Sequence, residues 1–191
     1  MVAYNKLGLI FLRRRQFPEA IEQFEQALKI KPDYADSHNN LGSAFVNTGQ
    51  LPEAIKQFEQ SLKIDSSIPW AHDNLGVALM RSGRLREAIE QFEQTLRLEP
   101  DYADAHNNLG IVFTRGGQLP EAIKQFEQSL QIDSTNPLAH NNLGVALIRS
   151  GRLPEAIEQF EQALRLEPDY ANARKNLLEA QTRLKLNPAK N

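Results

Sequence analysis

The 191-residue sequence contains no cysteine. Disulfide bonds, thiolate metal ligands and a cysteine nucleophile are therefore excluded, which fits a reducing compartment without requiring one. Charge of one sign is also scarce, because the formal net charge is only -2. Nucleic-acid-binding proteins usually carry a basic excess that neutralises phosphates. We therefore expect no nucleic-acid partner.

Long apolar runs and catalytic motifs are absent as well. No apolar stretch reaches the roughly 20 residues that a membrane-spanning helix needs, and the first residues lack the features of a secretory signal. The sequence has no glycine-rich phosphate loop, no His-Glu-x-x-His motif and no nucleophile elbow. We expect a cytoplasmic protein, or a fragment of a longer one, with no membrane insertion, no enzymatic activity, no metal and no cofactor.

The sequence does contain a repeat. The motif His-Asn/Asp-Asn-Leu-Gly begins at His38, His72, His106 and His140, which are 34 residues apart. A period of that length predicts one supersecondary unit that is stacked on copies of itself. The predicted single array over residues 1–186 has repeats at 1–34, 35–68, 69–102, 103–136 and 137–170, a capping helix at 171–186 and a tail at 187–191. Positions below are numbered as in the first repeat.

Two amphipathic patterns recur in each repeat. The first pattern places ring-bearing, apolar and small residues at positions 4, 7, 8 and 11, which is the spacing of one helix face. The second pattern places apolar and small residues at positions 20, 21, 24, 27 and 28, which is the face of a second helix. Glycine at position 15 suits the end of the first helix and proline at position 18 suits the start of the second. Capping side chains are expected at position 33, namely Asp33, Ser67, Asp101, Thr135 and Asp169. Each repeat is therefore predicted to be a helix pair.

These residues match a known pattern. Tyr4-Leu7-Gly8-Phe11 followed by Ala20-Phe24-Pro32 resembles the tetratricopeptide repeat (TPR). Histidine at position 4 of later repeats, and serine in place of the final proline at Ser66 and Ser134, depart from it. The resemblance implies an all-α, right-handed superhelical solenoid of antiparallel helix pairs. It also implies that the first helices line a concave groove, which binds peptides or protein segments.

A pair of repeats has been duplicated. Residues 35–102 and 103–170 agree at 54 of 68 positions. Positions 2, 5, 6, 9, 12 and 13 avoid the apolar seam and are expected to face the groove; 6 of these 12 pairs differ, against 8 of 56 elsewhere. The copies therefore diverged mainly on the expected groove. Diversification for binding explains this, and drift on a tolerant surface is the competing explanation.

Position 6 does not diverge. It holds Asn40, Asn74, Asn108, Asn142 and Asn176, whereas the first repeat has Lys6. A primary amide both donates and accepts hydrogen bonds, as pairing with a peptide backbone requires. We hypothesise an asparagine ladder that holds the main chain of an extended ligand. The alternative is that these residues cap or bridge adjacent helices.

Apolar residues and arginines surround the asparagines at positions 9, 12 and 13. They are Val77, Met80, Arg81, Ile111, Arg115, Val145, Ile148 and Arg149. An apolar floor with an arginine rim suits a ligand with hydrophobic anchors and acidic groups. The arginines could instead bind the C-terminal carbonyls of their own helices. The position-4 histidines are a full repeat apart, so that packing explains them better than a metal site.

Two other functions stay open. The N-terminal end has no polar capping segment, so the protein could be a scaffold that forms homo-oligomers through this uncapped end. The chain could also be the recognition arm of a larger enzyme. The sequence favours a non-enzymatic interaction module that binds an extended peptide or protein segment.

Overall fold

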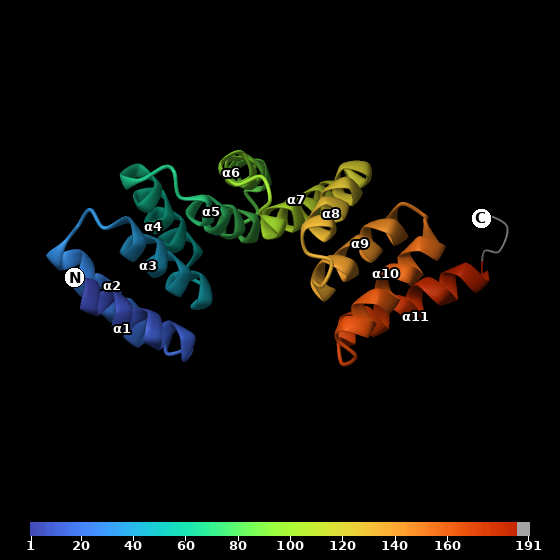
Figure 1. Ribbon diagram of the computed structural model, residues 1–191, viewed down its shortest axis with the longest axis horizontal. Helices are drawn as coiled ribbons and strands as arrows, with labels where there is room; N and C mark the ends of the chain where they lie inside the picture. Colours follow the sequence, from blue (N-terminus) through green and yellow to red (C-terminus); the bar gives the residue numbers. More distant parts are fainter. Residues whose placement is uncertain (187–191) are drawn as a thin grey trace. The chain divides into compact units, whose positions relative to one another are not determined.

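The computed structural model describes residues 1–186, which form eleven α-helices with no strand among them (Figure 1). The helices are α1 (Val2–Arg13), α2 (Phe17–Ile30), α3 (Ala35–Asn47), α4 (Leu51–Ile64), α5 (Pro69–Arg81), α6 (Leu85–Leu98), α7 (Ala103–Gly116), α8 (Leu119–Ile132), α9 (Pro137–Arg149), α10 (Leu153–Leu166) and α11 (Ala171–Leu186). The all-α prediction is confirmed. The predicted tail at 187–191 lies outside the described residues.

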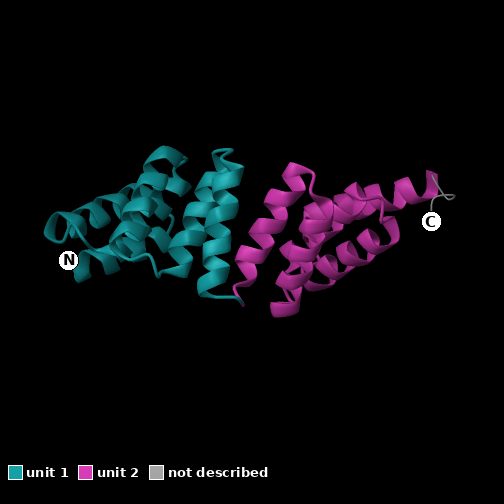
Figure 2. Cartoon of the chain, turned by 90° about the horizontal axis from the view of Figure 1, so that it is seen from above, with its two compact units in different colours: residues 1–100 teal, residues 101–191 magenta. Residues whose placement is uncertain are grey.

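The chain divides into two compact units, Met1–Pro100 and Asp101–Asn191 (Figure 2). Unit 1 contains α1 to α6 and unit 2 contains α7 to α11. Within each unit, every helix packs against the next helix along the chain. The prediction of one continuous array over residues 1–186 stays a prediction.

The core of each helix pair is a phenylalanine at position 24. Phe24, Phe58, Phe92, Phe126 and Phe160 are among the largest side chains that are fully buried. Burial of such a side chain contributes roughly 1.5–3 kcal/mol to the stability of the fold. In unit 1, Phe24 lies in one cluster with Leu41 of the next repeat. The same ring therefore joins one repeat to its neighbour.

Glycine at position 8 makes room for this ring. A methyl group added to Gly42 would lie 2.7 Å from Cε1 of Phe58 and 2.8 Å from Cδ1. The two helices of a repeat therefore approach as closely as the sequence predicts, and the neighbour of the glycine is the aromatic ring at position 24.

The turns between paired helices follow the predicted pattern. Gly49 has a φ of +79° after the end of α3, a conformation that glycine adopts without strain. Proline lies in the first turn of α2, α4, α8 and α10. Glycine and proline thus place most of these helix ends and starts, whereas α1 is followed by Arg15 at a φ of +60° and α6 begins without a proline.

The predicted caps at position 33 are wrong. The first helices of the later repeats start two residues further on, so that their N-cap residue is position 34. That position holds tyrosine or isoleucine in three repeats, and neither side chain caps its helix. At α9 the N-cap is Asn136, whose side chain accepts hydrogen bonds from the N–H groups of Leu138 and Ala139. In α9 the cap is therefore provided by the residue that follows the predicted one.

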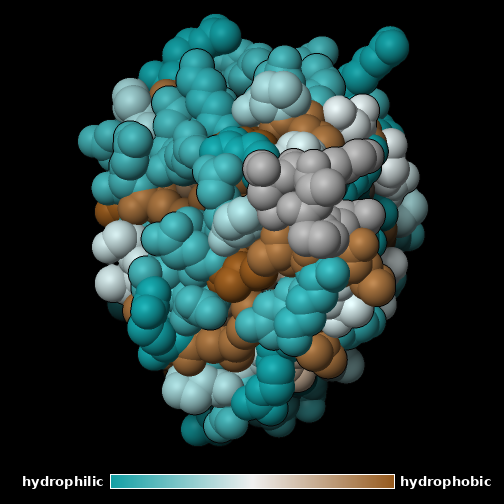
Figure 3. Space-filling model, turned by 90° about the vertical axis from the view of Figure 1, so that its right-hand side faces the viewer, coloured by the Kyte–Doolittle hydropathy of each residue, from teal (hydrophilic) through white to brown (hydrophobic). Residues whose placement is uncertain are grey.

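Helix α11 corresponds to the segment that follows the fifth repeat. Ala173 and Ala180 are buried, whereas Leu178, at position 8, is 66% exposed. From the end of the molecule where α11 lies, the surface is mostly hydrophilic, with hydrophobic strips between the polar side chains (Figure 3).

Candidate functional site

Positions 2, 6, 9 and 13 of each first helix lie on one helix face, because they are four, three and four residues apart. We call this face the stripe of that helix. The α5 stripe contains Trp70, Asn74, Val77 and Arg81. The α9 stripe contains Leu138, Asn142, Val145 and Arg149. All eight side chains are half-buried or exposed, so the stripes are accessible to a ligand.

Unit 1 contains a hollow of about 200 Å³ between the stripes of α3 and α5. We call it the α3–α5 hollow. Its lining residues are Ser43, Val46 and Asn47 of α3, Phe58 of α4, and Asn74, Val77 and Arg81 of α5. The phenylalanine comes from the second helix that lies between the two first helices. Three elements thus build one site.

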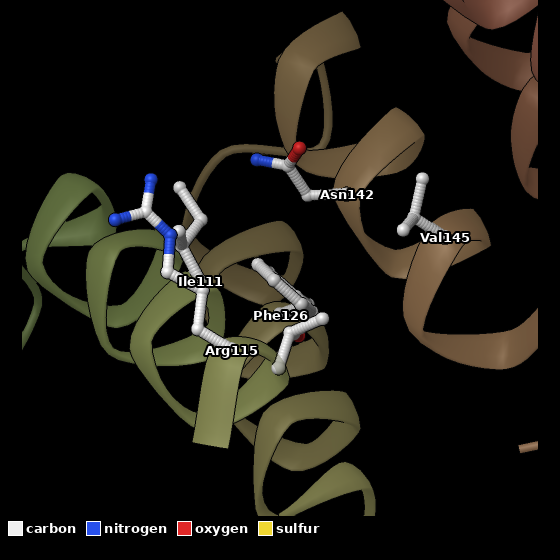
Figure 4. A pocket seen from close by; sticks show the side chains of 6 residues that line it. Ile111, Arg115, Phe126, Asn142 and Val145 are labelled. Atoms are coloured by element: carbon white, nitrogen blue, oxygen red, sulfur yellow. The ribbon is translucent and has the colours of Figure 1, made fainter. Parts of the chain in front are cut away.

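Unit 2 contains a hollow of about 200 Å³ at the equivalent place, between α7 and α9. We call it the α7–α9 hollow. Its lining residues are Ile111, Thr114, Arg115, Phe126, Asn142 and Val145. Each of them lies 68 residues after a residue of the α3–α5 hollow. In Figure 4, Ile111 and Arg115 project from α7 and Asn142 and Val145 from α9, with Phe126 of α8 between them.

The position-6 asparagines are held by the preceding repeat. The Nδ2 atom of Asn74 donates to Oδ1 of Asn39 at 3.0 Å, and Nδ2 of Asn142 donates to Oδ1 of Asn107 at 3.0 Å. The same bond joins Asn40 to Asn5 at 3.1 Å and Asn176 to Asn141 at 2.9 Å. The structure therefore contains the bridge between adjacent first helices that the alternative interpretation requires.

The bridge depends on the side chain at position 5, and the predicted location of this side chain is wrong. This position was expected to face the groove, but its side chain is buried, with exposures of 6% for Asn39 and 4% for Asn107. The buried amide orients the asparagine of the next helix. It leaves Oδ1 of that asparagine as a hydrogen-bond acceptor on the stripe.

Seven of the thirteen predicted site residues line the two hollows. They are Asn74, Val77, Arg81, Ile111, Arg115, Asn142 and Val145. Met80 is 7% exposed, so it offers little surface to a ligand. Ile148 packs against a buried hydrophobic cluster. Asn40, Asn108 and Asn176 are half-buried on α3, α7 and α11, outside both hollows, and Arg149 also lies outside the lining.

Six lining residues were not among the predicted site residues. They are Ser43, Val46, Asn47, Phe58, Thr114 and Phe126. Four of them, Ser43, Val46, Asn47 and Thr114, are at positions 9, 12 and 13, which differ between the duplicated repeats and were expected to face the groove. The two phenylalanines belong to the invariant core pattern, which gives no sign that one face of the ring lines a hollow.

The arginines at position 13 differ in their contacts. The Nη1 atom of Arg149 donates to the backbone oxygen of Thr114 in α7, which is the preceding first helix. This is not the expected contact with carbonyls of the arginine's own helix, because the carbonyl belongs to the preceding first helix. Arg81 and Arg115 are exposed and line the hollows.

The position-4 histidines connect elements of the scaffold. The Nδ1 atom of His38 lies 2.7 Å from Oε1 of Gln57, and its Nε2 atom lies 2.8 Å from the backbone oxygen of Pro32. His72 and His140 have equivalent partners. Residues 1–186 contain no group of three or more His, Cys, Asp or Glu side chains that could hold a metal ion.

None of the described helices is long and apolar enough to cross a membrane.

The fold and the recurring hollows define a helical-repeat protein whose first helices carry the exposed, variable positions. Family models described as tetratricopeptide repeat match residues 74–137 and 114–180, and one described as TPR repeat matches residues 8–49 and 42–83. Together they span nearly the whole chain. The chain belongs to the tetratricopeptide repeat family.

Solved structures have the same fold. The crystal structure of MamA is 26% identical, has a TM-score of 0.75 and covers 86% of this chain and 96% of its own. YrrB, a TPR protein, is 21% identical, with a TM-score of 0.72 and coverage of 94% and 90%. The pilF protein of Pseudomonas aeruginosa is 23% identical, with a TM-score of 0.79 and coverage of 98% and 92%. A search of curated proteins finds no match.

Proposed function

We propose that this protein is a non-enzymatic interaction module that binds an extended peptide or protein segment along the stripes of its first helices. The family and the fold support a protein–protein interaction module in general. YrrB is described as a TPR protein with an unusual peptide-binding site. Its likeness to this chain is one of fold alone, so it supports only what such a fold can do.

The observation that carries the proposal is the fixed orientation of the position-6 amides. The Nδ2 groups of Asn74 and Asn142 donate to the preceding repeat, and their Oδ1 atoms remain as acceptors beside the hollows. A main-chain N–H of an extended segment can donate to such an oxygen whatever the side chain of that residue. Because the amides are already ordered, binding loses little side-chain entropy at these positions.

The size of the hollows supports a peptide ligand over a metabolite. Each hollow has about 200 Å³, below the roughly 300–1,000 Å³ of sites that enclose a small molecule. That space suits a single side chain. An extended segment can place its side chains in such hollows while its main chain runs past the asparagines.

A peptide-display selection tests the proposal. Linear random peptides are selected against the wild-type protein and against Asn74→Ala/Asn142→Ala. A matched control is Lys56→Ala/Lys124→Ala, which changes two exposed residues 68 positions apart on α4 and α8. We expect peptides to bind the wild type and the control but to lose about tenfold or more in affinity for the asparagine variant, which lacks two hydrogen bonds. Equal affinity for all three proteins would contradict the ladder.

The structural role of the asparagines requires a second pair of variants. Asn39→Ala and Asn107→Ala remove the buried acceptors but keep Asn74 and Asn142 on the stripes. If the asparagines act only as bridges, both pairs of substitutions should lower stability without changing peptide affinity. If they also bind the ligand, the stripe variants should lower affinity more than the buried variants at equal stability.

Self-association through α1 is a second candidate function. Val2, Tyr4, Leu7 and Ile10 are exposed apolar residues on this helix, and Val2 and Ile10 are each nearly half exposed. Exposed apolar groups of this kind favour a protein contact. Sedimentation velocity of the wild type and of Tyr4→Ser/Leu7→Ser tests it. A mass that rises with concentration in the wild type and stays monomeric in the variant would support the scaffold, and a monomeric wild type would dismiss it.

A further inference from the structure

We propose, on the basis of the peptide binding proposed above, that the two hollows select different side chains. The α3–α5 hollow takes a short side chain that ends in an amide or a hydroxyl. The α7–α9 hollow takes a branched aliphatic side chain that has a carboxylate beside it. The partner is thus a linear protein segment, and the two units read different residues of such segments.

In the α3–α5 hollow, the polar side chains of the lining use their hydrogen-bond donors on acceptors within the protein. The Ser43 hydroxyl donates to the backbone oxygen of Asn39 at 3.1 Å, and Nδ2 of Asn47 donates to the backbone oxygen of Ser43 at 2.9 Å. Asn74 donates to Asn39 as described above. The oxygens of Ser43, Asn47 and Asn74 therefore remain as acceptors around the hollow.

One group on the rim of this hollow supplies donors. Within residues 1–186, the Arg81 guanidinium makes no hydrogen bond or ion pair, and it lines the hollow from α5. A ligand group that suits this site both donates to the oxygens and accepts from Arg81. A side-chain amide or hydroxyl has both capacities. An aliphatic group would leave these polar atoms without partners when water is displaced, which lowers affinity.

In the α7–α9 hollow, the corresponding wall combines one apolar side chain with Thr114 and Arg115. Ile111 takes the place of Ser43, and it packs with Val145 against the hydrophobic cluster of Phe126. The Thr114 hydroxyl donates to the backbone oxygen of Gly110 at 2.8 Å, so its proton is already used. A branched aliphatic side chain removes Ile111, Val145 and the face of Phe126 from water without leaving the Thr114 hydroxyl as an unpaired donor.

The two hollows also differ in which helix supplies the arginine of the lining. In the α3–α5 hollow the arginine is Arg81 on α5, and the opposite wall holds Asn47. In the α7–α9 hollow the arginine is Arg115 on α7, in the place of Asn47. Arg149, the counterpart of Arg81, donates to the carbonyl of Thr114 and is not part of the lining. A carboxylate is therefore favoured on the α7 side of the second hollow.

Three substitutions account for this difference, because the other lining residues shared by the two hollows are identical in type. The differing pairs are Ser43 and Ile111, Val46 and Thr114, and Asn47 and Arg115. Each side chain already occurs at the same repeat position elsewhere in the chain. The chain thus offers a reciprocal exchange in which each hollow serves as the control of the other.

The test uses a phage library of linear random peptides as the probe. It is selected against the wild type, against Ser43→Ile/Val46→Thr/Asn47→Arg, and against Ile111→Ser/Thr114→Val/Arg115→Asn. We expect two peptide classes from the wild type, one with amide or hydroxyl side chains and one with an aliphatic residue next to an acidic one. The first variant should retain only the aliphatic–acidic class, and the second only the amide or hydroxyl class.

Synthetic peptides from each class give the magnitudes. Replacing the aliphatic residue by alanine should weaken wild-type binding of its class about tenfold, and replacing its acidic neighbour should weaken it about two- to fivefold. Trp70 is the sole tryptophan of the chain and lies on the α5 stripe. Its fluorescence emission should change when a peptide of the amide or hydroxyl class binds.

Folding of the exchange variants is verified by circular dichroism. The single exchanges Asn47→Arg and Arg115→Asn alter only exposed side chains, so they retain the fold and still move the carboxylate preference. Peptides selected with the same preferences from the wild type and all variants would overturn the selectivity while leaving peptide binding intact. If the wild type selects no peptides at all, the proposed function fails, and the selectivity fails with it.

Discussion

Replacing Gly110 by alanine should destabilise unit 2, whereas the same replacement at Gly116 of the same helix should not. A methyl group on Gly110 would lie 2.5 to 2.7 Å from Cε1, Cδ1 and Cζ of Phe126. The ring is 1% exposed and lies in a hydrophobic core cluster, so it can give way only by shifting toward the α7–α9 hollow that it lines. Overpacking of this kind costs about 1–3 kcal/mol, and the better helix propensity of alanine offsets up to about 1 kcal/mol of it. We expect a net loss of about 1–2 kcal/mol.

Gly116 is the matched control. The nearest atom to a methyl group at this position is Oε1 of Gln118, at 3.4 Å. The equivalent residues Thr48, Ser82 and Ser150 carry ordinary side chains at φ values of -93°, -81° and -85°. Alanine at this position should therefore stabilise the protein by about 0.4–1 kcal/mol, because it restricts the unfolded chain.

Urea unfolding followed by far-UV circular dichroism measures both effects. The predicted result is an unfolding midpoint that falls for Gly110→Ala and rises for Gly116→Ala. An equal rise in both variants would show that Gly110 is not packed against Phe126. Such a result would refute our explanation of the glycine at position 8 in all five repeats.

Three further predictions concern single side chains. Asn107→Ala should lower the free energy of unfolding by about 1 kcal/mol, because Asn142 loses its acceptor; an unchanged urea midpoint would deny the bridge a role in stability. Asn136→Ala should cost about 1 kcal/mol through loss of the α9 cap, whereas Ile68→Ala, at a position with no side-chain cap, should show no cap effect and lose only its burial. Hydrogen bonds from the hydroxyl and the N–H of Thr135 lower the pKa of Asp133, so their stabilising effect is present above the unfolded pKa of about 4 and is lost as pH falls through the lower folded pKa. NMR titration should show the Asp133 pKa rising in Thr135→Val, and an unchanged value would contradict this assignment.

Much of the fold follows from local rules in the sequence. Glycine at position 15 of the second to fifth repeats and proline at position 18 of four repeats fix most of the turns after the first helices, because few other residues adopt those conformations without strain. The apolar spacing then determines which helix faces are buried. The helix starts were predicted less well, since the capping prediction at position 33 considered only side-chain chemistry. Position 34 takes the N-cap place through backbone geometry, even where it holds tyrosine or isoleucine.

The candidate site was predicted only in part. Position 5 is polar in every repeat, so the pattern placed it on the groove, although Asn39 and Asn107 are buried and bonded to the next first helix. Their burial is tolerated because each amide pairs with an asparagine 35 residues further on. A pair so far apart along the chain leaves no periodic signal within one helix. Likewise, nothing in the sequence distinguishes Phe58 as both a core residue and the base of a hollow.

The most direct test of peptide binding at the stripes is to observe the side-chain amide NMR signals of Asn74 and Asn142. The signals are assigned from the Asn74→Ala and Asn142→Ala spectra and then followed as a selected peptide is added. If Oδ1 accepts a peptide N–H while Nδ2 keeps its bond to the preceding repeat, the signal of at least one of these amides should shift in step with saturation. A peptide that binds fully while both signals stay unchanged would contradict the account.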